Sequence, residues 1–347
     1  MGVTASRSGS EGKRQLSTCK PPTIPGAKRM GNKTRLFFAT DVHGSEKCFL
    51  KFVNAPAAYN VSVLILGGDV TGKMIVPIVK RDDGTSSAEF LGTKQILKSD
   101  QEIEELEKRI RFTGYYPFRT NTEEMAAMQR DPAKVDAVFT KVMLDTLRLW
   151  TQIAEERLKG KGVKIYMTGG NDDRMEIEDV LKSSNYVIDP EGEIVTLDGG
   201  YEMISSGWSN ATPWKTPREC SEEELTGKLD SMISKVKDMK RCIFNMHVPP
   251  YDTGLDTCPK LDENLKPVYA GSEIMMISAG SKAVRSAIEK HQPLLGLHGH
   301  IHESRGFVKI GRTLCLNPGS EYTEGMLRGV VVELDGEKVR NYLLTVG

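Results

Sequence analysis

The sequence predicts an α/β fold, because short apolar runs alternate with segments of helical pattern from Thr34 onward. Several of these runs end in Asp, Asn or His, often beside glycine, at the strand edge where open α/β sheets bind ligands. The chain has 347 residues, 39% apolar and 27% charged, so it can bury a sizeable core. No apolar run approaches the ~18 residues that a membrane-spanning helix needs.

Residues 1–33 are rich in Ser, Gly, Pro and basic side chains, so we expect a disordered N-terminal tail before one domain at 34–347. The first residues fit the pattern for myristoylation of Gly2. A solvated tail is the preferred interpretation, and Met30 is an alternative start. With no signal-peptide segment and six scattered cysteines without a CxxC pair, we expect a cytoplasmic protein with reduced thiols.

The strands are predicted from short apolar runs bounded by turn residues. In chain order they cover Arg35–Thr40, Val61–Leu66, Val163–Thr168, Arg241–Met246, Pro293–Leu297, Thr313–Leu316 and Gly329–Glu333. A further strand-like cluster covers Tyr186–Ile188, Glu193–Leu197 and Tyr201–Ser205.

Three helices are predicted from side chains that cap a helix N-terminus. They run from Asp131-Pro132 to about Leu158, over about Glu222–Asp238 after the capping box of Ser221 and Glu224, and from Ser281 to about Lys290. The stretch 98–160 is charged, mostly helical and longer than a crossover between two strands needs. We interpret it as a helical insertion, placed to cap an active site.

The histidines gather at strand ends. Of six histidines, five lie at or just after the end of a predicted strand, namely His43, His247, His298, His300 and His302. A single histidine there would more often be structural than a ligand. Five of six indicate a binding site at that edge.

Acidic and amide side chains follow the same rule, because Asp41, Asp69 and Asn171 also follow predicted strands. Carboxylate, imidazole and amide ligands without sulfur suit Mn, Fe, Zn or Mg better than a structural zinc. Two such ions can clamp a displacement at phosphorus and lower the pKa of a bridging water. Asp69 is the natural carboxylate to be shared between them.

In chain order the motifs read D-x-H, G-D, G-N, a lone His and G-H-x-H, followed by an Asn-Pro-Gly-Ser turn at 317–320. This order resembles the calcineurin-like metallophosphoesterase superfamily over residues 35–320. The resemblance implies a two-sheet β-sandwich flanked by helices in four layers, with a dinuclear centre for which manganese is favoured. It implies that the first ion is bound by Asp41, His43 and His302, the second by Asn171, His247 and His300, and that Asp69 bridges them.

One position departs from the family pattern. The family usually has a histidine after its G-N motif, commonly assigned to protonating the leaving group, where this chain has Asp172 followed by the supporting acid Asp173. An aspartate beside two cations stays ionised and is a poor general acid. We therefore expect a substrate with a good leaving group or another proton donor, with Asp172 and His298 as the catalytic candidates.

Residues 67–73 match part of a P-loop, which makes a P-loop NTPase a minor alternative. Met74 stands where the magnesium-binding Ser or Thr would be. Lys73 remains a candidate contact for a substrate phosphate.

The loop 207–218 offers further candidate substrate contacts in Trp208, Trp214 and Arg218. Aromatic side chains on a loop can form a platform for a base or ring. Packing of the loop against the body explains them at least as well.

The predicted function is metal-dependent hydrolysis of a phosphodiester or phosphomonoester by hydroxide held between the ions, on a small, nucleotide-like substrate. The zero net charge argues against long duplex nucleic acid as a partner. The main alternative is a non-catalytic scaffold of the same fold, supported only by the missing histidine. The sequence leaves the oligomeric state open.

Overall fold

The computed structural model describes residues 33–347. The predicted tail before Lys33 and the Gly2 motif lie outside the described residues.

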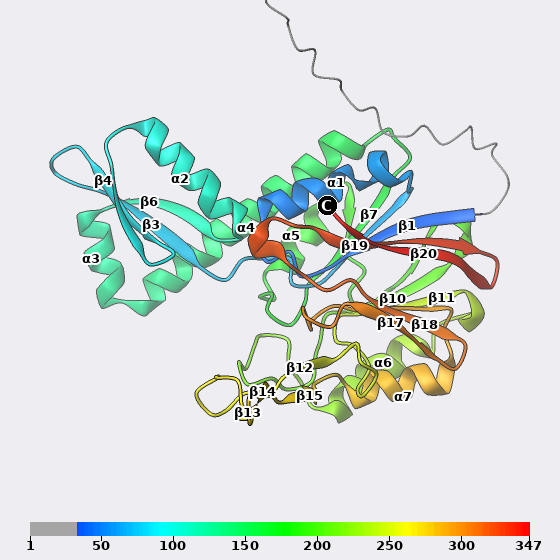
Figure 1. Cartoon of the computed structure of the whole chain (residues 1–347). Helices are drawn as coiled ribbons and strands as arrows, with labels where there is room; N and C mark the ends of the chain where they lie inside the picture. The colour runs from blue at the N-terminus through cyan, green and yellow to red at the C-terminus, as the bar shows by residue number, and fades with distance from the viewer. Residues whose placement is uncertain (1–32) are drawn as a thin grey trace, which may run out of the picture. The chain divides into compact units, whose positions relative to one another are not determined.

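Two six-stranded sheets form the body (Figure 1). The first has the order β20 (Lys338–Val346), β19 (Arg328–Asp335), β1 (Lys33–Ala39), β2 (Val63–Gly67), β7 (Lys164–Thr168) and β8 (Val187–Ile188). The second has the order β17 (Gly306–Ile310), β18 (Thr313–Asn317), β16 (Leu295–Leu297), β11 (Cys242–Met246), β10 (Glu202–Ser206) and β9 (Ile194–Thr196).

Both sheets are parallel at their centres and antiparallel at an edge. In the first sheet β1, β2, β7 and β8 run parallel, while β19 and β20 are antiparallel additions. In the second, β10, β11, β16 and β18 run parallel, while β9 and β17 are antiparallel. Parallel strands place their carboxyl ends at one edge, so the loops after them can share a site.

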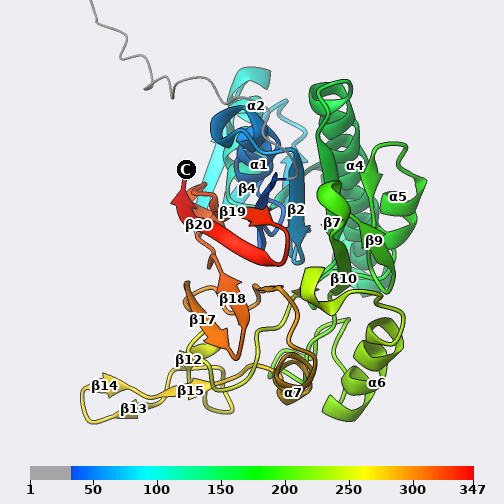
Figure 2. The ribbon, with the colours of Figure 1, turned by 90° about the vertical axis from the view of Figure 1, so that its right-hand side faces the viewer.

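Alternation of side chains along the strands creates four layers. On β1, Phe37 and Ala39 face a core shared with α1 (Glu46–Tyr59), α4 (Pro132–Leu158) and α5 (Ile177–Ser183). Leu36 and Phe38 face the opposite side, where they pack in one core with side chains of the second sheet. The outer face of the second sheet is covered by α6 (Glu222–Ile233) and α7 (Lys282–His291), as Figure 2 shows.

The predicted two-sheet α/β sandwich is therefore confirmed. Every strand predicted between 35 and 333 lies within two or three residues of an observed one, and the three capped helices begin where expected. The capping box of Ser221 and Glu224 forms, although α6 ends at Ile233, before the expected end at about Asp238. Among the helices of residues 33–347, none has the length and hydropathy of a membrane span.

The stretch 98–160, expected as a helical insertion, contains α2 (Asp100–Phe112), α3 (Thr122–Arg130), α4 and one strand, β6 (Tyr116–Asn121). Before it lie three strands that were not predicted, β3 (Ile75–Lys80), β4 (Ser86–Phe90) and β5 (Thr93–Leu97). They form a four-stranded sheet with β6 in the order β5, β4, β3, β6. These elements have a small core of their own, to which Ile78, Phe90 and Leu106 contribute. β4 (SSAEF) and β5 (TKQIL) are short and contain few apolar side chains, so their apolar pattern in the sequence is weak.

The P-loop alternative is wrong, because the loop after β2 leads into β3 and not into a helix.

The remaining elements are small. Two two-stranded sheets lie between β11 and α7, formed by β12 (Thr257–Pro259) with β15 (Met276–Ser278) and by β13 (Tyr269–Ala270) with β14 (Glu273–Ile274). Single turns of 3-10 helix occur at Asp198–Gly200, Met239–Arg241 and Tyr322–Glu324.

An aromatic stack contributes to the contact between α1 and α4, in which the rings of Phe49 and Trp150 lie 4.2 Å apart and nearly parallel. Trp150 is only 2% exposed. We expect Trp150→Ala to lower the free energy of unfolding by about 3–5 kcal/mol, because it leaves a cavity between the helices. Leu149→Ala, at a 48% exposed position of the same helix, should change it little in urea unfolding. Equal losses in both variants would contradict this.

Candidate metal centre

All seven predicted ligands come from loops at the carboxyl ends of parallel strands. Asp41 and His43 follow β1, Asp69 follows β2 and Asn171 follows β7, in the first sheet. The second sheet supplies the rest, with His247 after β11 and His300 and His302 after β16. The two sheets therefore meet at this edge and each contributes part of one site.

The backbone at the site is strained. Asp41, His43, Asp69 and His300 all have positive φ, between 41° and 65°, a conformation uncommon for residues other than glycine. Each costs about 1–3 kcal/mol and persists only because its surroundings impose it. Here hydrogen bonds do so, because the amide of Asp41 donates to the carbonyl of Gly68 and that of His43 to the carbonyl of Asp69, both at 2.9 Å. Such strain is typical of functional sites.

Close approach of the loops also requires glycine at two positions. A Cβ on Gly68 would lie 2.3 Å from His247 Nδ1, and one on Gly170 would lie 2.2 Å from Asp69 Oδ1. Both distances are too short for any side chain. The glycines of the G-D and G-N motifs therefore let the ligand loops pack against each other.

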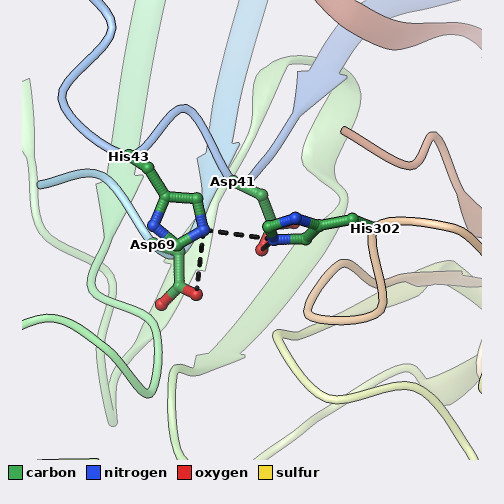
Figure 3. A group of neighbouring side chains, drawn as sticks. All are labelled: Asp41, His43, Asp69 and His302. Carbon is green, nitrogen blue, oxygen red and sulfur yellow. Dashed lines mark hydrogen bonds and ion pairs between the residues drawn. The ribbon is translucent and has the colours of Figure 1, made fainter. Parts of the chain in front are cut away.

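The first group of ligands is Asp41, His43, Asp69 and His302, whose ligand atoms all lie within 4.8 Å of one another (Figure 3). His43 Nε2 lies 3.1 Å from His302 Nε2 and 3.5 Å from Asp69 Oδ2. His302 Nε2 lies 3.3 Å from Asp41 Oδ1. Lone pairs that converge in this way repel one another unless protons or a cation lie between them.

The second group centres on Asn171. Its Oδ1 lies 3.1 Å from His247 Nε2 and 2.6 Å from His300 Nδ1. His247 Nδ1 lies 2.9 Å from the carbonyl oxygen of Gly67, an interaction that assigns a proton to Nδ1 and directs Nε2 into the site. Asp69 Oδ2 is 3.4 Å from His247 Nε2, so this one oxygen contacts both groups.

The charges of the site suit cations. Burial lowers the pKa of His43 to about 3 and that of His300 to about 4, so both rings are neutral and can offer a lone pair. Burial alone would raise the pKa of Asp41, but His302 and His247 lower it to about 2. Burial acts to lower the pKa of His247, but Asp69 and Asp41 raise it to about 10. A divalent ion would replace the proton of His247, and the donor set therefore fits the metals expected.

Asp173 lies behind the ligands and joins two of their loops. Its carboxylate accepts hydrogen bonds from the amides of Val70, Thr71 and Gly170 at 2.8–2.9 Å. The side chain is fully buried. It therefore fixes the loop after β2 against the loop after β7, and with it Asp69 against Asn171.

Asp172 lies beside the centre and forms an ion pair with Lys73. Their side chains are 17% and 49% exposed, and Asp172 Oδ2 is 3.9 Å from His43 Nδ1. Both line a cavity of about 230 Å³, together with Thr71, Gly72, Phe139, Met143, Arg174 and Pro217. The structure thus brings two predicted site residues together at an opening next to the ligands.

Three predicted site residues need correction. His298 is fully buried and its Nδ1 contacts the carbonyl of Met246 at 2.9 Å, so its ring packs inside the second sheet. Trp208 packs against the core under α6, with the ammonium of Lys228 3.9 Å from its ring centre. Arg218 is also fully buried. Sequence could not show this, since the direction of a side chain next to a site depends on tertiary contacts.

Trp214, in contrast, is 59% exposed and stays a candidate substrate contact. Sequence reasoning missed Tyr322, whose ring centre lies 4.7 Å from that of His43 and 6.0 Å from that of His302. It follows the Asn-Pro-Gly-Ser turn closely. Ser320 of that turn donates to the carbonyl of Asp41 at 2.6 Å, so the turn itself was the available signal.

Comparison with known proteins supports the fold. No protein-family model matches the chain. The uncharacterized protein MJ1162 of Methanocaldococcus jannaschii is 34% identical over 158 residues, which cover 45% of this chain and 64% of that protein, less than two thirds of its length.

Among solved structures, TT1561 of Thermus thermophilus is similar with a TM-score of 0.50 and 13% identity, over 90% of this chain and 98% of that one. A structure described as a novel archaeal phosphodiesterase is similar with a TM-score of 0.37 and 15% identity, over 90% of this chain and 100% of that one. The first likeness shows the fold alone, and the second is too weak to argue from.

Because Asp69 Oδ2 contacts both groups of ligands, we expect Asp69→Ala to reduce the uptake of Mn²⁺ to one ion or none. Equilibrium dialysis of chelator-treated protein, followed by metal analysis, measures this directly. Asp145→Ala is the matched control, because Asp145 forms only exposed ion pairs on α4. Unchanged uptake in Asp69→Ala would show that this carboxylate is not a ligand.

Proposed function

We propose that the protein is a metal-dependent phosphoesterase that hydrolyses a small phosphodiester or phosphomonoester. The observation that carries the proposal is the position of Asp69 Oδ2, 3.5 Å from His43 Nε2 and 3.4 Å from His247 Nε2. One buried carboxylate between two sets of imidazole, carboxylate and amide donors suits a pair of divalent ions. When bound, two such ions lower the pKa of a water and neutralise phosphoryl charge.

Lys73 is the residue we assign to the phosphoryl group. Partial burial acts to lower its pKa, but the hydrogen bond and charge of Asp172 raise it, so Lys73 stays a cation at neutral pH. Asp172 forms an ion pair with the ammonium group of Lys73, and the same carboxylate oxygen lies near His43. A fixed cation next to the ligands stabilises negative charge that develops on the phosphoryl oxygens.

The cavity beside Lys73 supports a compact substrate. Its volume of about 230 Å³ is below the range of about 300–1,000 Å³ typical of pockets for larger ligands. Phe139 and Met143 of α4 give it an apolar wall, and Arg174 lies over the ring of Phe139 at 4.9 Å. We propose that the substrate carries a small flat group, as a nucleotide-like compound does, that packs against these walls.

With Mn²⁺ added, we expect the protein to hydrolyse bis-p-nitrophenyl phosphate faster than p-nitrophenyl phosphate. Both carry a good leaving group, as a site without a histidine proton donor requires. A chelator should abolish the activity and Mn²⁺ should restore it. Protein that binds two ions but hydrolyses neither compound would favour the non-catalytic scaffold.

We expect Lys73→Met to lower kcat/KM by about 10-fold or more, since it removes one charge that stabilises the transition state. Asp172→Asn should give a smaller loss, because Lys73 keeps its charge but loses its charged partner. The control is Lys94→Met, whose side chain is exposed on β5. Wild-type rates in both site variants would exclude a role for the Lys73–Asp172 pair.

A further inference from the structure

The segment Ser209–Cys220 closes on itself and lies against the second group of ligands; we name it the strap. The amide of Ser209 donates to the carbonyl of Arg218, and the amide of Cys220 donates to the carbonyl of Ser209, both at 3.0 Å. The amide of Arg218 donates to the carbonyl of Asn171 at 3.2 Å. The strap therefore has fixed ends and direct contact with a ligand loop.

Thr216 of the strap contacts the side chain of Asn171. Asn171 Nδ2 donates to Thr216 Oγ1 at 2.9 Å, and Thr216 Oγ1 donates to Glu219 Oε1 at 2.6 Å. The carboxylate can only accept, so the single hydroxyl proton of Thr216 is used on Glu219. Toward Asn171, the hydroxyl can then only accept.

This chain of hydrogen bonds fixes which end of the amide faces the ligands. Because the NH₂ group of Asn171 must face Thr216, its Oδ1 must face His247 and His300, as observed at 3.1 and 2.6 Å. A flipped amide would direct NH₂ into the site, and an NH₂ group cannot bind a cation. The direction of the amide thus decides whether this group can bind an ion.

We propose that Thr216, oriented by Glu219, is a positioning residue that sets the affinity of the ion site formed by Asn171, His247 and His300. The inference rests on the proposed function, because it concerns the second ion of the same centre. It concerns neither the first ion nor the overall stability of the strap.

The strap has other anchors, so loss of the Thr216 hydroxyl is a local change. Glu219 also accepts hydrogen bonds from the amides of Thr212 and Thr216, at 3.0 and 2.8 Å. The buried guanidinium of Arg218 donates to the carbonyls of Asp173 and Arg174 and to Glu178 Oε1, at 2.7–3.2 Å. These contacts remain when residue 216 is changed.

The test is a titration of metal-free protein with Mn²⁺ alone, by calorimetry and by equilibrium dialysis with metal analysis. We expect Thr216→Val to weaken binding of the second ion about 10–100-fold, as loss of a group that orients a ligand does. The first ion should bind as in the wild type. Thr216→Ser, which keeps the hydroxyl, should bind both ions normally.

Thr212→Val is the matched control, because Thr212 bonds to Glu219 but not to Asn171. It should leave the second ion unaffected. Thermal unfolding of each metal-free variant reports the fold, and Thr216→Ala removes the same hydroxyl if the valine variant does not fold.

Wild-type affinity for both ions in Thr216→Val overturns the inference, as does an equal loss in Thr212→Val. Wild-type protein that binds fewer than two ions overturns the proposed centre itself, and the inference with it. The two failures are therefore distinguishable, and neither depends on an activity assay.

Discussion

The buried carboxylate of Asp69 is the constraint on which the site depends. A charge this far from water is costly unless it is compensated on every side. Its Oδ2 faces His43 and His247, while its Oδ1 accepts the amide of Asp172 at 3.0 Å. Three loops, after β1, β7 and β11, must therefore be held at fixed distances around the carboxylate of Asp69.

Loops from both sheets surround Asp69. Loops after neighbouring parallel strands approach Asp69 from one sheet, while His247, His300 and His302 approach from the other. Packing between the sheets is mostly apolar, and one buried hydrogen bond, from Asn245 on β11 to Thr168 on β7, joins them. This packing fixes their separation. The strained residues at the edge persist because this core and the carboxylate of Asp173 determine the loop positions.

The sequence predicted those parts whose signals are local. Cap residues such as Ser221 and Asp131 marked helix starts, and buried strands appeared as apolar runs. The ligand motifs were therefore assigned correctly to the carboxyl ends of the strands. The short strand β4, whose sequence is SSAEF, lacked such a pattern. Convergence of the ligands could be predicted from strand ends, but the direction of single side chains could not. His298 and Arg218 have the right chemistry and the wrong orientation, which only tertiary packing determines.

An asparagine at position 171 explains why a strap is needed at all. A carboxylate would present an acceptor in either orientation and would require no threonine to fix it. It would, however, add a negative charge. With Asn171, the ligand set has only the carboxylates of Asp41 and Asp69, which neutralise half the charge of two divalent ions. Because Lys73 and Asp172 together are neutral, the proposed centre would keep positive charge to attract a phosphoryl group. In the proposed centre the amide would preserve this positive charge, and the hydrogen bonds of the strap are the structural requirement that follows from that choice of ligand.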